Sequence, residues 1–363
     1  MGTQAAADTV ATPQVGEEYR KYARRKFLVI GAIGLLTLVL AVVAMGLGSA
    51  DLSPGRVLRA LVGLADERTE QIILHIRLPR VIAALVAGMG LSAAGCVMQN
   101  LLVNPLASDY TLGVSQGAAF GAAVGIVALG AGTIQSSSMD AVLISSPYMV
   151  TLFAFLGAFS ATMVVLALAK YRGVTPETMI LAGVALGALF SAGMVITQYF
   201  ASDVQVASIV FWTFGDLGRA SWQELAIISA VTVPAFVFFM LNRWNYAVLA
   251  TGDDTAKALG VRVERTRMVG MLVASLVASV CVAFLGIIAF VGLVGPHLMR
   301  RLIGDDYRFL IPASPVMGAL LLLASDTVGR TIIAPVVLPV GAITSFMGAP
   351  LFLYLLIRGY RRR

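Results

Sequence analysis

The chain has 363 residues, of which 59% are hydrophobic and 12% are charged. A soluble domain has about 45–50% apolar and about 25% charged residues, so this sequence cannot cover a water-facing surface of normal size. These proportions exclude a large soluble domain. They predict a protein that crosses a membrane many times.

The chain begins with a polar segment. Residues 1–26 are predicted to be a cytoplasmic N-terminal tail, which ends in a basic cluster from Arg20 to Lys26. The apolar run that follows, residues 27–48, is longer than the roughly 7–15 residues of a signal-peptide core. We therefore expect an uncleaved first span.

About ten apolar stretches follow one another between residues 27 and 358, which we treat as a single transmembrane domain. Residues 359–363 are a basic segment, expected on the cytoplasmic side. Residues 294–303 are too short to cross alone. Counting them as a span places the basic residues Arg300, Arg301 and Arg308 on the cytoplasmic side and makes the number of spans even. The predicted spans are residues 27–48, 81–103, 112–130, 148–169, 178–200, 222–241, 268–293, 294–303, 309–333 and 340–357.

Ten spans divide into two halves of five, and a repeat with an odd number of spans must be inverted in the membrane. The predicted fold class is therefore an all-α integral membrane protein with about ten transmembrane helices in two inverted five-helix halves. Both chain ends are expected in the cytoplasm, because that arrangement places most of the 26 lysines and arginines there.

The positive charges on the other side are all arginines. They are Arg56, Arg59, Arg68, Arg77, Arg80, Arg219 and Arg330. Arginine forms fixed, bidentate pairs with carboxylates, which favours a docking surface for an acidic partner. The alternative is that long side chains extend to the membrane surface, and we prefer this for Arg56, Arg59, Arg68 and Arg219.

Glycines recur every four residues at Gly113, Gly117, Gly121 and Gly125. This spacing lines one helix face with hydrogen atoms and predicts close packing against a neighbouring helix.

Ionisable residues inside the spans are scarce. Asp326 is the one acid well inside an apolar span, and Arg330 lies four residues further on the same helix face. An Asp–Arg pair is more typical of a structural contact than of a proton relay, so a carrier driven by an ion gradient is the second hypothesis. The sequence predicts no metal site, because His75 and His297 lie far apart. It predicts no disulfide, because both cysteines lie in apolar runs.

No phosphate-binding loop motif of ATPases occurs, so ATP would have to bind another subunit. The loop at about residues 243–267 is the candidate for receiving that subunit. Within it, Asp253 can cap a short helix that Gly260 ends, and Ala256 and Leu259 would form a small apolar face. The same pattern is equally typical of a simple connector. The candidate coupling residues are Gly252, Asp253, Asp254, Ala256, Leu259 and Gly260.

Over residues 27–358 the chain resembles the FecCD-type permeases of ABC importers, which transport iron-siderophore complexes, haem and cobalamin. The resemblance is carried by Ile76-Arg77-Leu78-Pro79-Arg80, Asn104-Pro105-Leu106-Ala107, Leu112 to Ala118, Leu181 to Gly187, Gly252 to Val261, Phe290 to His297, Asp326 with Arg330, and Leu338 to Pro350.

The resemblance implies a homodimeric type II importer permease with two ABC ATPase subunits beneath it and a substrate-binding protein outside. It also implies that residues 252–260 dock on the ATPase, and that Arg77, Arg80 and Arg330 receive glutamates of the binding protein. Asn104 and Thr175 match positions near the cytoplasmic gate, although Pro176 departs from the small polar residue usual beside Thr175.

We therefore predict the permease subunit of an ATP-driven importer in the cytoplasmic (inner) membrane, in contact with lipid and not with nucleic acid. The cargo is expected to be an iron chelate, most simply a ferric siderophore, with haem and cobalamin as alternatives. The chain is not expected to be an enzyme or to bind a cofactor or metal, since ATP-Mg would bind the partner subunit. A structural or sensory membrane protein is the third class.

Overall fold

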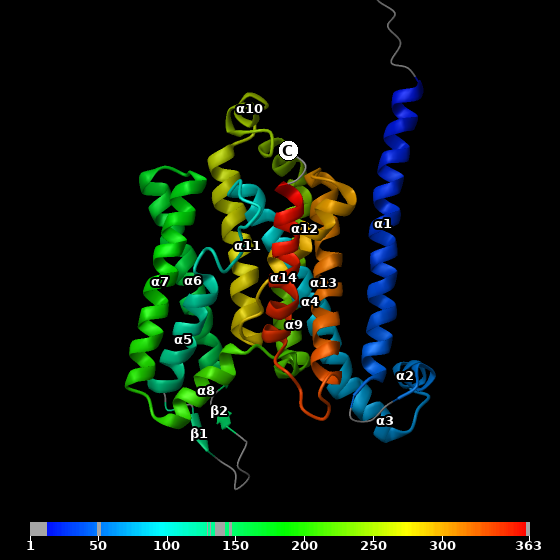
Figure 1. Ribbon diagram of the computed structural model, residues 1–363, viewed down its shortest axis with the longest axis vertical. Coiled ribbons are helices and arrows are strands. Elements are labelled where there is room, and N and C mark those ends of the chain that lie inside the picture. The colour runs from blue at the N-terminus through cyan, green and yellow to red at the C-terminus, as the bar shows by residue number, and fades with distance from the viewer. Residues whose placement is uncertain are drawn as a thin grey trace, which may run out of the picture.

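The computed structural model describes residues 13–48, 52–128, 130, 132–134, 142–144 and 147–360. Figure 1 shows a bundle of helices with short connections at both ends. An antiparallel hairpin pairs Gly132 with Ile144. The elements are α1 (Pro13–Gly46), α2 (Pro54–Leu61), α3 (Glu67–Gln71), the π-helix η1 (Ile72–Arg77), α4 (Leu78–Leu101), α5 (Val114–Ala128), β1 (Gly132–Ile134), β2 (Val142–Ile144), α6 (Pro147–Arg172), α7 (Pro176–Tyr199), α8 (Asp203–Thr213), the 3-10 helix η2 (Leu217–Arg219), α9 (Trp222–Leu249), α10 (Asp253–Ala258), α11 (Val263–Leu285), α12 (Val291–Ile303), α13 (Tyr307–Thr331) and α14 (Val340–Tyr360).

The membrane-spanning helices agree with the predicted all-α class. In the described part of the chain, seven helical segments are long and apolar enough to cross a membrane. Two shorter apolar helices, α5 and the first part of α14, lie in the same bundle, as does α12 at the position of the predicted short span (Figure 1). In lipid, a helix is the local structure that satisfies every backbone N–H and C=O within one segment.

Predicted boundaries differ from the structure at several helices. Two differences are extensions: helix is continuous over Glu67–Leu101 instead of the predicted 81–103, and α9 reaches Leu249 instead of residue 241. Two others have a local cause. The first helix begins at Pro13, so residues 13–26 extend the first span as helix, as their Glu, Lys, Arg and Ala side chains favour. Residues 1–12 and 361–363 of the two predicted tails lie outside the described residues. The second difference is at α11, which ends at Leu285 because Gly286 adopts φ 77°, and α12 then begins at Val291.

The centre of the bundle consists of α4, α11 and α13. Of the most apolar stretch of each helix, 78% is buried in the segment containing α4, against 17% in α1 and 17% in α7. Figure 1 places α1 and α7 at opposite edges of the bundle. Close packing at the centre depends on glycines, because Gly88 of α4 meets the backbone of Gly318 and Gly95 meets that of Gly292. The outer helices therefore present most of their apolar surface to lipid.

The third helix is short in each predicted half. It is α5 in the first half and α12 in the second, and non-helical residues precede each of them. Both connections contain a non-glycine residue with positive φ, Val103 (48°) and Phe290 (67°). Irregular backbone at membrane depth is tolerated where protein or a water-filled path surrounds it. The two connections are thus the places where each half departs from simple helix packing.

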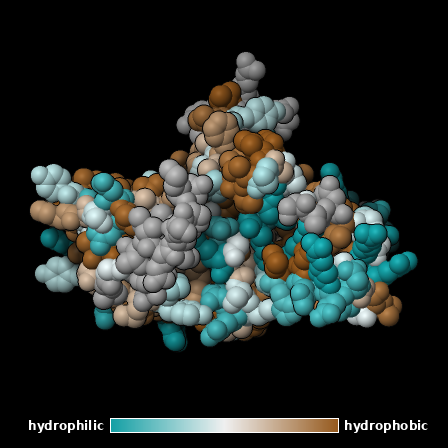
Figure 2. Space-filling model, turned by 90° about the horizontal axis from the view of Figure 1, so that it is seen from below, coloured by the Kyte–Doolittle hydropathy of each residue, from teal (hydrophilic) through white to brown (hydrophobic). Residues whose placement is uncertain are grey.

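The two ends of the bundle differ. At one end, here called the α10 face, lie α10, the start of α1 and the last described residues (Figure 1). At the other end, here called the α2 face, lie α2, α3, the hairpin and α8. Seen from below, the α2 face carries many hydrophilic side chains, most densely on the side where α2 and α3 lie (Figure 2).

Candidate functional site

A cluster of buried charges lies near the α2 face. Asp326 of α13 accepts from Arg80 of α4 (Nε to Oδ1, 2.9 Å) and from Arg330 one turn further along α13 (Nε to Oδ2, 2.9 Å). The Asp326 side chain is completely buried, and Arg80 and Arg330 are 15% and 9% exposed. Arg80 also pairs with the half-exposed Asp216 at 3.3 Å. Each oxygen of Asp326 is therefore bound to a guanidinium.

Two of the arginines also satisfy the end of α1. Arg77 Nη1 donates to the carbonyls of Met45 (2.7 Å) and Gly46 (2.9 Å). Arg330 donates to those of Leu47 and Ala44, both at 3.2 Å. The last carbonyls of a helix lack partners within it and carry the negative end of its dipole, so cationic donors stabilise them.

The inward direction of Arg77 has a local cause. Pro79 has no N–H, and the chain before it forms the π-helix η1, in which the Leu78 N–H bonds to Ile73 O. Arg77, at the end of this wide turn, is buried. Arg77, Arg80 and Arg330 are therefore all engaged in contacts within the chain. Their reception of a partner's glutamates stays a prediction, and it would require these internal bonds to exchange.

The other four arginines of this face behave differently. Arg56, Arg59 and Arg68 are exposed on α2 and α3, and the extension of their side chains toward the membrane surface stays a prediction. Arg219 instead donates to the carbonyls of Phe211 (2.8 Å) and Trp212 (3.3 Å) near the end of α8. Burial lowers the pKa of Arg219, and the nearby Asp216 carboxylate opposes that change.

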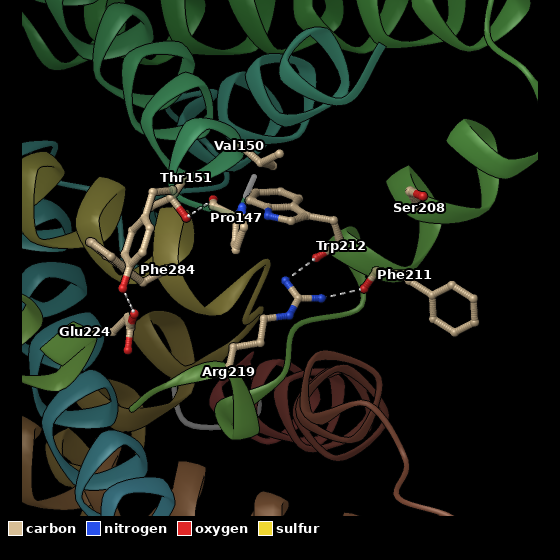
Figure 3. Close-up of a pocket in the computed structure, with 10 residues that line it drawn as sticks. Pro147, Val150, Thr151, Ser208, Phe211, Trp212, Arg219, Glu224 and Phe284 are labelled. Carbon is tan, nitrogen blue, oxygen red and sulfur yellow. Dashed lines mark hydrogen bonds between the residues drawn. The ribbon is translucent and has the colours of Figure 1, made fainter. Parts of the chain in front are cut away.

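A cavity of about 370 Å³ lies beside Arg219, between α6, α8 and α9 (Figure 3). Its polar groups are already engaged within the protein: Tyr148 donates to Glu224 (2.8 Å) and Thr151 to Pro147 O (3.0 Å). The volume is near the lower end of small-molecule sites. It is lined by Pro147, Tyr148, Val150, Thr151, Ser208, Phe211, Trp212, Arg219, Glu224 and Phe284.

On the α10 face, α10 is bounded by two glycines in left-handed conformations, Gly252 (φ 110°) and Gly260 (φ 85°). The predicted helix is present, but Gly252 takes the cap position, and Asp253 is its first residue. Ala256 is fully buried against the rest of the chain, whereas Leu259 is 66% exposed. The expected shared apolar face is therefore not formed, and Leu259 alone of these two residues is accessible to a partner.

Asp253 pairs with a residue that the sequence analysis did not single out. Arg267 of α11 is 1% exposed and forms a bidentate pair with Asp253, at 2.9 and 3.1 Å. Arg267 is one of several cations in the loop at residues 243–267, and charge alone does not separate it from its exposed neighbours. The available signal was its position at the start of α11, directly before the apolar residues of that helix.

The two predicted gate residues have local roles. Asn104 Oδ1 accepts from the Leu106 N–H (2.9 Å) in the connection between α4 and α5. Thr175 caps α7 by accepting from the Thr178 N–H (3.3 Å), and Pro176 follows in the first helical position, where its missing N–H costs nothing. These contacts account for Pro176 in place of a small polar residue. A role of either residue as a gate stays a prediction.

The glycine series lies at two helix contacts. Gly117 and Gly121 meet backbone carbonyls of α6, and Gly125 lies beside the side chain of Phe153 on the same helix. Gly113 faces α7 instead, where added bulk would lie 3.0 Å from Gly183 O and Gly187 N. The described residues contain no cluster of three or more His, Cys, Asp or Glu side chains that could hold a metal ion.

The comparisons with known proteins concern nearly the whole chain. The profile of the FecCD transport family matches residues 36–358. A Methanocaldococcus jannaschii protein named as an ABC transporter permease is 53% identical over 349 residues, 96% of this chain and 99% of the relative. The Fe(3+)-citrate import system permease protein of Bacillus subtilis is 36% identical, covering 92% of this chain and 96% of the relative.

Two further comparisons agree. The hemin transport system permease protein of Yersinia pestis is 34% identical, covering 93% of this chain and 97% of the relative. A solved chain described as a metal-chelate type ABC transporter in an inward-facing conformation has a TM-score of 0.79 and 29% identity, covering 91% of this chain and 99% of that chain.

Proposed function

Because the chain belongs to the FecCD transport family and is a permease subunit of an ABC importer, we propose that it carries a ferric siderophore across the cytoplasmic membrane. The observation that carries the choice of cargo is the match, at 36% identity and over more than nine-tenths of both chains, to a permease named for Fe(3+)-citrate import. The match to the permease named for hemin is 34% identical and supports haem instead. Haem and cobalamin are the competing cargoes. The permease itself is not catalytic, and the importer's ATPase supplies the energy.

The state of Asp326 argues against a carrier driven by an ion gradient. A proton relay needs a carboxylate that can exchange its proton, and such residues are rare and functional in transporters. Both oxygens of Asp326 are instead bound to Arg80 and Arg330 in a buried cluster. Neither oxygen is left open to a water or a cargo proton, so the geometry favours a structural contact over a relay.

We propose that the α10 face is cytoplasmic and that the α2 face receives the substrate-binding protein. The orientation is supported by the basic residues near the start of α1 and beside α12, which lie on the α10 side. Exposed Leu259 and the glycine-bounded α10 would meet the ATPase. On the opposite face, carboxylates of the binding protein would compete with Asp216 for Arg80, whose side chain is the most exposed of the cluster.

We further propose that two copies of the chain enclose the path, with transport by alternating access between outward-open and inward-open states. ATP binding and hydrolysis in the partner subunits would move α10, and the connections before α5 and α12 would rearrange. Asn104 and Thr175 lie beside moving segments in this scheme.

The test is uptake into proteoliposomes that contain this chain and its co-purifying ATPase, with binding protein outside. Ferric siderophores, haem and cobalamin are supplied separately, with and without internal ATP. Accumulation of a ferric siderophore only with ATP supports the proposal, and ATP-dependent accumulation of haem or cobalamin instead replaces the cargo. Flux that ignores ATP and follows an ion gradient refutes the importer.

A further inference from the structure

Arg267 binds three separate parts of the α10 face. Its guanidinium lies at the start of α11 and is almost completely buried. Nε donates to Leu101 O at the end of α4 (2.8 Å), and Nη1 donates to Val174 O in the connection between α6 and α7 (3.0 Å). Both terminal nitrogens also bind the Asp253 carboxylate of α10. One side chain of α11 therefore joins α4, α10 and the connection between α6 and α7.

The contacted backbone leads directly to the predicted gate segments. Leu101 is the last residue of α4. Val103, whose φ is 48°, lies two residues further along, and Asn104 comes directly after it. Val174 immediately precedes Thr175, the cap of α7. A shift of the Leu101 carbonyl therefore changes the geometry of the connection that contains Asn104. A shift of the Val174 carbonyl changes the start of α7 at Thr175.

The attachment of α10 makes this side chain a mechanical link. Gly252 and Gly260 at the two ends of α10 allow backbone rotation, and added side-chain bulk at either would meet nothing within 4 Å. Ala256 and the Asp253–Arg267 pair hold the helix to the bundle. A guanidinium is planar and donates in a fixed fork, so its partners move together rather than independently.

The exposure of the pair is unequal. Asp253 is 41% exposed on the side from which a docked subunit would approach, and Arg267 is 1% exposed. A surface salt bridge is worth little, and a buried charge is costly unless it is paired and hydrogen-bonded. Placing arginine here, bound to two carbonyls as well as to Asp253, provides a rigid connection that an apolar side chain of similar size would not.

We infer that Arg267 is a positioning residue that transmits movement of α10 to the ends of α4 and α7, and so couples ATP hydrolysis to opening of the path. The inference rests on the proposed function, in which α10 docks on the ATPase. Arg267 touches neither ATP nor cargo in this scheme. Its loss uncouples the two activities instead of abolishing ATP hydrolysis.

The experiment compares cargo transported per ATP hydrolysed in reconstituted complexes. We expect Arg267→Lys to retain the ATPase and its hydrolysis but to lower this ratio at least tenfold. For Asp253→Asn, whose carboxylate lies in the docking segment, we expect the same fall in the ratio in the complexes that form. Glu264→Gln is the matched control, because it also converts a carboxylate to an amide and breaks an ion pair between α10 and α11, with Lys257. That pair is exposed and contacts no gate segment, so the ratio should stay within twofold of the unchanged protein.

A second variant separates coupling from folding. Replacing a buried ion pair as a whole by apolar residues is often neutral for stability, so the double variant Asp253→Leu with Arg267→Met should fold. We expect the folded complexes that this variant forms to transport at least tenfold less cargo per ATP hydrolysed than the unchanged protein. A normal ratio in it, or in both single variants, overturns the inference alone. No ATP-dependent uptake by the unchanged protein overturns the proposed function and the inference with it.

Discussion

Replacement of Asp326 by asparagine tests whether the charge cluster of α4 and α13 stabilises the bundle. The substitution leaves Arg80 and Arg330 close to an uncharged amide in a buried site. Removing one partner of a buried ion pair costs about 3–5 kcal/mol. Arg80 keeps Asp216 at 3.3 Å, and Arg330 keeps two carbonyls of α1 at 3.2 Å, so we expect the lower part of that range, about 3 kcal/mol.

The assay is denaturant unfolding of the permease in mixed micelles, which gives the free energy of unfolding for each variant. Asp216→Asn is the control, because it removes a half-exposed partner of the same arginine and should cost about 0–1 kcal/mol. The triple variant Asp326→Leu, Arg80→Met and Arg330→Met removes all the charges at once and should lose less than Asp326→Asn alone. Equal losses for Asp326→Asn and Asp216→Asn would refute the cluster as a buried structural element.

Three further predictions concern other parts of the chain. Gly121→Ala places a methyl group on a backbone carbonyl of α6 and should cost about 1–3 kcal/mol in the same unfolding assay, and Gly125→Ala, whose nearest atom is a side-chain carbon at 3.2 Å, should cost clearly less; equal costs would contradict the backbone contact. Leu259→Glu should reduce ATPase retention on the purified permease at least tenfold without changing its unfolding, and full retention would argue against docking at α10. Partial burial raises the pKa of Asp306, but hydrogen bonds from the Arg308 side chain and backbone outweigh it and hold that pKa below 3.8. Because the folded pKa is depressed, the stabilisation by the Asp306 carboxylate is fully present above pH 3.8 and is lost as the pH falls through the lower folded pKa. Asp306→Asn should therefore weaken the fall in unfolding free energy below pH 4. An unchanged fall in the variant would refute the assignment.

The sequence predicts the membrane class and the positions of the long apolar helices well, because the lipid environment demands helices of that length and composition. The boundaries at α11 and α12 were harder, since residues 286–290 are as apolar as the helices beside them. There the chain leaves the helix through Gly286 and Phe290, both with positive φ. A glycine within an apolar run signals either close packing or a break, and local sequence does not distinguish the two.

The charged sites show a different limit. The pairing of Asp326 with Arg330 followed from their four-residue spacing, but the Arg80 contact joins residues 246 positions apart. The same holds for Arg267, whose partners Val174 and Leu101 are 93 and 166 positions away. Spacing within a helix is fixed by its geometry, whereas contacts between helices depend on how the whole bundle packs. Which arginines turn inward therefore became visible only in the folded chain.

The end of α1 has a consequence for the order in which the protein is made. Its last carbonyls are bound by Arg77, from the beginning of the next long helix, and by Arg330, which lies 283 and 286 positions beyond the carbonyls it binds. The carbonyls at the end of the first helix therefore gain their bonds from Arg330 only after α13 has been synthesised. Without α13, Arg77 would be the one of these two arginines left to bind the carbonyls, and α1 would also lose its packing against α13, so an interrupted chain that stops before α13 would hold its first helix less firmly.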